Sequence, residues 1–538
     1  MKSINAKPKH DSRRHFLQSV AGATTFVTLS KKKIQTAQPG SFELDEVTVK
    51  DLQTAMQSGQ YTAAAITEKY LVRIAAIDKA TTNAVIETNP EALQIAAQLD
   101  QERKAGKVRG PLHGIPVLIK DNIDTADKMQ TTAGSLALVG SPAPRDASIV
   151  EQLRAAGAVL LGKTNLSEWA NFRSSKSTSG WSGRGGLTRN PYALDRNTSG
   201  SSSGSGAATA ANLCAISIGT ETDGSIVSPS SLNSLVGIKP TLGLWSRSGI
   251  IPIAHSQDTA GPMCRTVTDA AILLGALTGA DRNDALTFQN GKKAERDYTR
   301  FLDPNGLKGA RIGVARNYFG FNERVDKLIN DAIDVIKRLG ATVIDVELPN
   351  KGKYEDAEYE VLLYEFKADL NSYLAKRGAA VKSINDVIAF NEQNRDKELS
   401  RFGQDIMVKA AAKGDLNSPA YKAALAKSKR MTQAAGIDAV LAKHRLQALV
   451  APTDGIPWLT DYLNGDHFSG GCSTPAAVAG YPHVTVPVGY IYGLPLGVSF
   501  FGAAWSEGTL IKFAYAFEQA TKHRKPPQFL SSADLTRS

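Results

Sequence analysis

Thr198 to Pro229 reads TSGSSSGSGAATAANLCAISIGTETDGSIVSP. The stretch opens as a Gly/Ser loop and passes through an Ala-rich segment that is typical of a helix. It continues into an apolar run, Cys214 to Ile218, and ends in a polar turn that presents Ser225. Gly/Ser composition is also typical of a flexible linker. The helix and strand that follow at once favour two serine-bearing loops held together by packed elements.

Two familiar kinds of loop do not fit this stretch. A phosphate-binding P-loop needs Gly-Lys-Ser/Thr at its end, whereas Gly206 is followed by two alanines. Ser225 also lacks the GxSxG elbow of α/β-hydrolases. A serine nucleophile remains possible, because glycine-bearing turns expose backbone N–H groups that could hold an oxyanion.

Such a serine needs a base, and with no histidine nearby a lysine is the natural one. Lys120 ends the apolar run Ile115 to Ile119, which predicts a buried strand. Taken alone, a lysine in this place is usually a solvated strand end. If it is buried, its ammonium form is disfavoured and it could act as a base.

The rest of the chain alternates helical and strand-like patterns. Helices are predicted from Thr48 and from Tyr61-Thr62, and strand, helix and strand follow between residues 311 and 348. We therefore expect an α/β fold, a single large domain with a central mixed β-sheet covered by helices. Residues 354–442 are predicted to be a mainly helical insertion, within a domain that spans 41–538.

Composition excludes several classes of function. The formal net charge is +11, but residues 1–40 hold eight Lys and Arg against one Asp, so the rest of the chain is nearly balanced. No basic stripe with interleaved aromatics indicates a nucleic-acid partner. Three cysteines and eight scattered histidines match no metal motif, so no metal and no cofactor are expected. No apolar run is long enough to span a membrane.

Residues 1–40 are predicted to be an export leader. Arg13-Arg14 precede a weakly hydrophobic run, Ser19 to Leu29, a pattern that resembles a Tat signal. It predicts a periplasmic or secreted protein; the alternative is a disordered basic tail on a cytoplasmic protein.

An ordered set of motifs resembles the amidase signature family. GIPVLIKDN, LGKTNLSEWANF, GSSSGSG, TETDGSIVSP, GIKPTLG, SQDTAGPM and AVAGYPHVTVPVGYIYGLPLGVSFFGAAW follow one another, and the resemblance spans Leu52 to Thr521. ETDGSIV and EFKADLNSYLA resemble the peptide amidase branch, which deamidates peptide C-termini.

The resemblance implies a Ser–cisSer–Lys triad. Lys120 matches the family's lysine, Ser201 its relay serine after a cis peptide bond, and Ser225 its nucleophile. The backbone from Thr222 through Asp223 and Gly224 would hold the oxyanion. The implied reaction is hydrolysis of a carboxamide, a peptide C-terminal amide or another small amide, to acid and ammonia through an acyl-enzyme.

Some positions depart from the commoner family pattern. Ser199 and Ser203 replace glycines, and Glu221, Asp223 and Val227 stand where Asp, Gly and Arg are usual. Phe172 lies in a polar loop, where an aromatic side chain can line the substrate pocket or simply pack against its neighbours. Two alternatives stay open: a glutamyl-tRNA amidotransferase A-like subunit that feeds ammonia to a tRNA-charging complex, and a non-catalytic binding protein on the amidase scaffold.

Overall fold

The computed structural model describes residues 42–290 and 293–536, and Glu43–Ser538 forms one compact unit. The leader predicted for residues 1–40 lies outside the described residues and stays a prediction.

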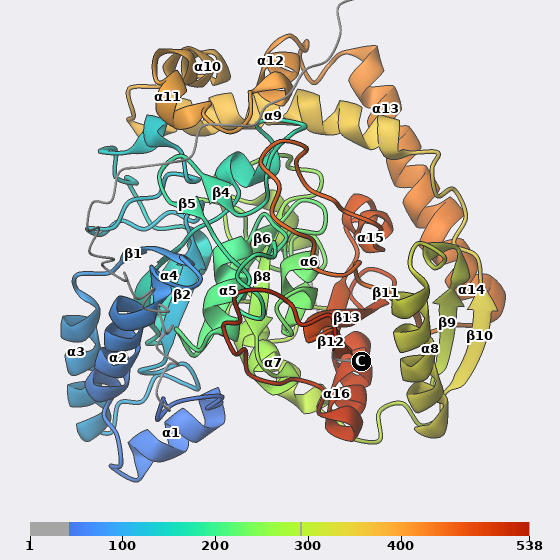
Figure 1. Cartoon of the computed structure of the whole chain (residues 1–538), viewed down its shortest axis with the longest axis horizontal. Helices are drawn as coiled ribbons and strands as arrows, with labels where there is room; N and C mark the ends of the chain where they lie inside the picture. The colour runs from blue at the N-terminus through green and yellow to red at the C-terminus, as the bar shows by residue number, and fades with distance from the viewer. Residues whose placement is uncertain (1–41, 291–292, 537–538) are drawn as a thin grey trace, which may run out of the picture. The chain divides into compact units, whose positions relative to one another are not determined.

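The unit is built on a mixed sheet of 11 strands in the order β1-β3-β2-β6-β8-β7-β12-β13-β11-β9-β10 (Figure 1). The fold-class prediction is confirmed. The strands are β1 (Val85–Thr88), β2 (Pro116–Lys120), β3 (Val159–Thr164), β6 (Ile216–Glu221), β7 (Val236–Lys239), β8 (Thr259–Cys264), β9 (Arg311–Ala315), β10 (Thr342–Val346), β11 (Ala448–Pro452), β12 (His483–Ile491) and β13 (Leu494–Phe501), with a separate pair β4 (Trp181–Ser182) and β5 (Gly186–Leu187).

Helices cover this sheet. They are α1 (Val49–Gln57), α2 (Ala63–Arg73), α3 (Ala92–Lys104), α4 (Ser148–Ala155), α5 (Ser203–Ala210), α6 (Val227–Ser231), α7 (Val267–Ala276), α8 (Glu323–Arg338), α9 (Glu355–Arg377), α10 (Ile384–Gln393), α11 (Arg395–Glu398), α12 (Asp405–Ala411), α13 (Pro419–Thr432), α14 (Asp438–His444), α15 (Ser473–Ala479) and α16 (Glu507–Thr521). Figure 1 shows α1 to α3 at one end of the unit and α8 and α14 at the other.

Local signals in the sequence explain where several helices begin. Thr48 caps α1 with a capping box shared with Asp51, and Thr62 caps α2 through its side chain. The predicted strand at 311–315 and the helix after it are present as β9 and α8. These predictions are confirmed because capping and periodicity act over a few residues.

One of the two parallel parts of the sheet, β3-β2-β6, carries the serine loops, and the other is β11-β9-β10. β2 pairs in parallel with β3 on one side and β6 on the other, and every residue of the three strands is buried. Strands covered on both faces need apolar residues on both sides, which is why the run Val117 to Ile119 of β2 does not alternate. Carboxyl ends of parallel strands meet at one edge, so Lys120 and the end of β6 lie side by side.

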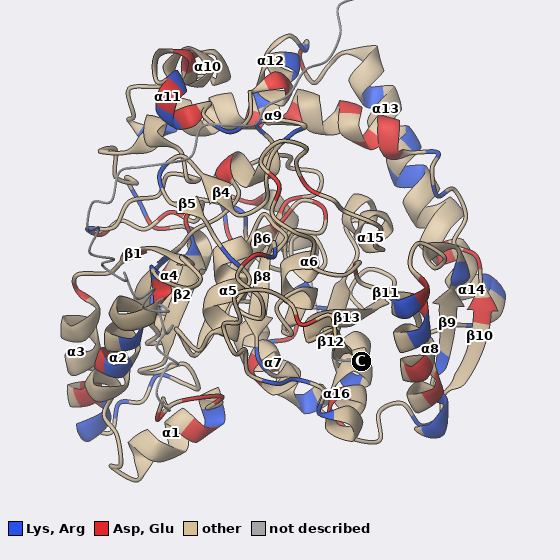
Figure 2. Ribbon diagram, in the orientation of Figure 1, with Lys and Arg blue, Asp and Glu red and all other residues tan. Residues whose placement is uncertain are grey.

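The segment from α9 to α14 is helical and borders the sheet in Figure 1. The inner face of α9 packs into an apolar cluster with Trp169 and Phe172 of the core. On α8 basic and acidic side chains are mixed (Figure 2), whereas the charged side chains of α13 are all basic. No helix among the described residues is long and apolar enough to cross a membrane.

A buried ion pair joins this helical segment to the core. Arg173 pairs with the carboxylate of Glu168, and its guanidinium lies 3.6 Å from the carboxylate of Glu398 in α11. It also donates to the backbone oxygen of Glu398 at 2.6 Å. The side chains of all three residues are fully buried. Its guanidinium also lies 4.2 Å from the centre of the Phe402 ring.

Arg173→Leu should lower the free energy of unfolding by about 3–5 kcal/mol, because it leaves two buried carboxyl groups without a cation. The measurement is the urea midpoint of unfolding. The matched control is Arg395→Ala, which breaks an ion pair whose side chains are 64% and 48% exposed and should cost at most about 1 kcal/mol. Equal midpoints for the two variants would contradict the interpretation.

Candidate active site

The structure brings Lys120 and Ser201 together. Lys120 ends β2 with its side chain fully buried, and its Nζ lies 2.7 Å from Ser201 Oγ. The same Nζ donates to the backbone oxygen of Thr220 at 3.2 Å and to Thr220 Oγ1 at 2.8 Å. Asn122 Nδ2 donates to Thr220 Oγ1 from the other side at 3.0 Å.

Burial lowers the pKa of Lys120 to about 7, because the ammonium form loses its hydration. The negative charges of Asp258 and Glu221 act in the opposite direction but compensate only in part. A large fraction of Lys120 is therefore a neutral amine at neutral pH.

Ser201 and Ser225 lie on adjacent segments. The bond between Gly200 and Ser201 is a cis peptide, and the N–H of the next residue, Ser202, donates to the backbone oxygen of Ser225 at 3.3 Å. Ser225 is 9% exposed, and its hydroxyl makes no hydrogen bond to another described residue. The bond from Lys120 to Ser201 is formed in this structure, whereas the hydroxyls of Ser201 and Ser225 are not bonded to each other.

The turn before Ser225 presents free backbone donors. Within the described part of the chain, the N–H groups of Asp223, Gly224 and Ser225 have no acceptor, and Gly224 adopts a φ of +79°. A positive φ suits glycine and allows successive N–H groups to converge. Glu221 holds the far side of the turn, because its Oε2 accepts from the N–H groups that open α6, at 2.8 and 3.1 Å.

Thr222 is fixed from behind by residues far along the chain. Its hydroxyl donates to Asp258 Oδ1 at 2.6 Å, and Asp258 Oδ2 accepts from the N–H groups of Ile253 and Ala254. Gln257 Nε2 donates to the Thr222 backbone oxygen at 3.2 Å and to Glu358 of α9 at 2.9 Å. Burial raises the pKa of Asp258 to about 6.

Asp223 lies beside Ser473 and Thr474 at the start of α15, and burial raises its pKa.

Phe172, predicted to line a pocket, packs edge-to-face on Phe366 of α9 with ring centres 5.1 Å apart. It is 9% exposed. Its contact with a substrate stays a prediction.

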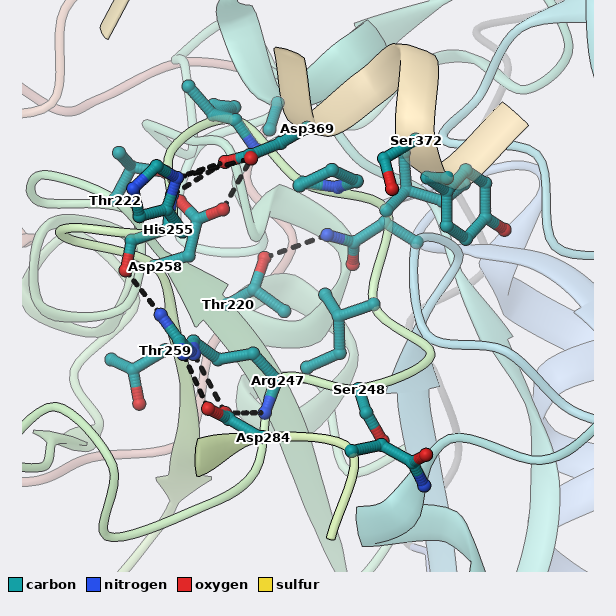
Figure 3. A pocket seen from close by; sticks show the side chains of 18 of the residues that line it. Thr220, Thr222, Arg247, Ser248, His255, Asp258, Thr259, Asp284, Asp369 and Ser372 are labelled. Atoms are coloured by element: carbon teal, nitrogen blue, oxygen red, sulfur yellow. Dashed lines mark hydrogen bonds and ion pairs between the residues drawn. The ribbon is translucent and has the colours of Figure 1, made fainter. Parts of the chain in front are cut away.

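A cavity of about 300 Å³ lies behind this turn (Figure 3). Thr220, Thr222 and Asp258 form one wall, and the Arg247–Asp284 pair forms another. The cavity thus reaches the residues that hold Lys120 and the turn before Ser225.

One group beside this cavity has metal-ligand atoms. The donors of His255, Glu365 and Asp369 lie within 4.8 Å of one another. His255 Nδ1 is 2.9 Å from Asp369 Oδ2, and its Nε2 is 3.4 Å from Glu365 Oε1. Because the three side chains already satisfy one another, they act here as a link between α9 and the loop that carries Asp258.

Sequence reasoning missed Thr220, Asn122 and Asp258. The apolar run alone predicts a strand that ends at Ile218, but β6 runs on to Glu221 and places Thr220 beside Lys120. The signal that could have pointed to Asp258 is the motif SQDTAGPM, which contains it.

Comparison with known proteins places the chain in a family. The amidase family model matches residues 65–511. The chain is similar to the native peptide amidase of Stenotrophomonas maltophilia, with 52% identity and a TM-score of 0.87, covering 91% of this chain and 100% of that one. It is 43% identical to a probable amidase of Arabidopsis thaliana over 91% of this chain and 93% of the relative. It is 33% identical to the A-type subunit of the glutamyl-tRNA(Gln) amidotransferase of Symbiobacterium thermophilum over 87% of this chain and 95% of the relative.

The chain belongs to the amidase family, and it is an amide-hydrolysing enzyme.

Lys120 should lose its proton near pH 7 in an NMR titration of labelled lysine side chains, with Lys120→Met to assign the signal. Asp258→Asn should lower the pKa further, because the Asp258 charge stabilises the ammonium. Lys239, whose pKa burial lowers to about 8, is an internal reference. A Lys120 signal that titrates above pH 10 would contradict the assigned environment.

Proposed function

We propose that this enzyme is a serine amidase that hydrolyses peptide C-terminal amides through an acyl-enzyme on Ser225. Lys120 is the base and Ser201 the relay. The observation that carries the proposal is the 2.7 Å hydrogen bond between the buried Lys120 amine and Ser201 Oγ. The next residue, Ser202, donates its N–H to the backbone oxygen of Ser225, so the loop of Ser201 lies against that of Ser225.

The hydrogen bonds of Lys120 fit a neutral base. A neutral amine has two N–H bonds and one lone pair. The N–H bonds point to the two oxygens of Thr220, which leaves the lone pair for the hydroxyl proton of Ser201. Thr220 is therefore a positioning residue that orients the lone pair.

The reaction follows from this arrangement. Lys120 takes the proton of Ser201, Ser201 takes that of Ser225, and Ser225 Oγ attacks the amide carbonyl. The N–H groups of Asp223, Gly224 and Ser225 stabilise the oxyanion. Ammonia leaves with the proton returned through Ser201, and water then releases the acid.

Peptide amides are favoured over the other substrate classes by two observations. Identity to the solved peptide amidase is 52%, against 33% for the amidotransferase relative. The two stretches that resemble peptide amidases are also linked through one loop. Glu365, in EFKADLNSYLA, accepts from the N–H of Ser256, and Asp258 of the same loop accepts from the hydroxyl of Thr222, in ETDGSIV.

Ser225→Ala should reduce ammonia release from a peptide amide by about 10⁴-fold or more, because it removes the nucleophile. The control is Ser230→Ala in α6, a fully buried hydroxyl without a hydrogen-bond partner among the described residues. A serine-reactive phosphonate should label the wild type and the control, and not Ser225→Ala. Full ammonia release by Ser225→Ala would refute the proposal. A panel of peptide, fatty and aryl amides defines the preferred class.

Thr220→Val should lower kcat by about 10–100-fold with little change in KM, because the N–H bonds of the Lys120 amine lose one of the two acceptors that orient its lone pair. Thr220→Ser keeps the hydroxyl and should retain most activity. A Thr220→Val enzyme as active as Thr220→Ser would remove Thr220 from the mechanism.

For the wild type, kcat/KM should rise with pH through about 7, because the neutral amine of Lys120 is the active form.

A further inference from the structure

A second chain of hydroxyl groups runs between the two catalytic segments. Ser199 Oγ lies 2.6 Å from Ser228 Oγ, and Ser228 Oγ hydrogen-bonds to Asp454 Oδ2. Ser199 is two residues before Ser201, and Ser228 is three residues after Ser225. The same two segments therefore carry the catalytic serines and this second pair.

The second pair faces the same opening as the nucleophile. Most residues of the two segments are closed to solvent, and Ser201, Ser202, Ser203, Ser230 and Ser231 are at most 1% exposed. Ser199, Ser225 and Ser228 retain 5%, 9% and 8%. Ser225 and Ser228 are three residues apart across the start of a helix, a spacing that puts both side chains on one face.

The direction of the hydrogen bonds follows from Asp454. Its side chain is fully buried, and Oδ1 accepts from the N–H of Gly455 at 2.8 Å. An ionised Asp454 takes the only proton of Ser228, so the proton of Ser199 must go to Ser228. Burial raises the pKa of Asp454 to about 7, so the ionised form prevails in alkaline solution.

Ser199 Oγ is thereby left as a hydrogen-bond acceptor toward the opening. The backbone groups of Ser199 are already used, since its N–H donates to Asn197 Oδ1 at 2.7 Å and its oxygen accepts from Ser203 Oγ at 2.6 Å. A hydroxyl that donates to a chain ending on a carboxylate is a stronger acceptor than an isolated one.

We propose that Ser199, oriented by Ser228 and Asp454, accepts the backbone N–H of the residue that carries the scissile carboxamide. The inference rests on the proposed function, and it adds a specificity residue for peptide substrates. A peptide amide has two kinds of N–H next to the reacting carbonyl. The carboxamide nitrogen faces Ser201, which returns the proton to it, so the backbone N–H is the one that needs another acceptor. Simple aliphatic amides lack this group.

The test compares two substrates that differ by one methyl group. One is an N-acetyl amino-acid amide with its backbone N–H, and the other is the same compound methylated on that nitrogen. In the wild type, the N–H substrate should have a kcat/KM about tenfold or more above the methylated one, as expected for one hydrogen bond.

Ser199→Gly is the sharpest variant, because Ser199 has a φ of +59° that glycine adopts without strain. It should lose about tenfold on the N–H substrate and almost nothing on the methylated one, so that the ratio between them collapses toward one. Ser228→Ala should reduce the ratio in the same direction, which provides a second variant if Ser199→Gly folds poorly. The control Ser230→Ala should keep the wild-type ratio.

The outcomes separate the two proposals. If the wild type releases ammonia from peptide amides but Ser199→Gly and Ser228→Ala keep its substrate ratio, the Ser199 inference is wrong and the proposed function stands. The methyl group would then act by its size alone. If the wild type hydrolyses neither substrate, while it does hydrolyse other amides, the peptide-amide proposal itself fails.

Discussion

The burial of the Lys120 amine is the constraint on which the site depends. In water this amine would be protonated at neutral pH and would have no lone pair to offer. Burial at the end of β2 lowers its pKa to about 7, and three hydrogen bonds to Ser201 and Thr220 replace the lost water. The parallel pairing of β2 with β6 supplies these partners, because Ile119 lies opposite Ile218 and the ends of both strands reach the same edge.

The helical segment contributes to the site without containing a predicted catalytic residue. Glu358 and Glu365 of α9 bind Gln257 and the N–H of Ser256, and that loop continues into Asp258. Asp258 in turn fixes Thr222. The turn from Thr222 to Ser225 is thus held from behind by a helix more than a hundred residues later in the chain. This support fixes the direction of the free N–H groups of the turn, and fixed donors are what the oxyanion role proposed for them requires.

Lys120 shares its burial with two other strand lysines that local sequence does not distinguish from it. Lys120, Lys163 and Lys239 each follow a short apolar run in a β-strand, and burial lowers their pKa values to about 7, 8 and 8. Lys163 donates to Ile123 O and Thr131 Oγ1, and Lys239 donates to Pro240 O. Of these three, Lys120 is the one that bonds a serine of the Gly/Ser loop within the described chain. A lowered pKa therefore does not distinguish Lys120 from the other two lysines, whereas its hydrogen bond to Ser201 does, and the proposal that it is the base rests on that bond.

The sequence by itself determined the local elements, the two serine-bearing loops and the family. Thr48 and Thr62 cap helices, apolar runs become buried strands, and the ordered motifs from Leu52 to Thr521 identify an amidase. These signals act within a few residues or lie in continuous linear motifs. Tertiary structure alone decided that Thr220 orients Lys120, that Asp258 holds Thr222, and that Asp454 polarises Ser228 and Ser199. The partners in each of these contacts are 36 to 226 residues apart, except for the Ser199–Ser228 pair. Periodicity and composition carry no information about such pairs, because strand register and helix docking bring them together only when the whole sheet has formed.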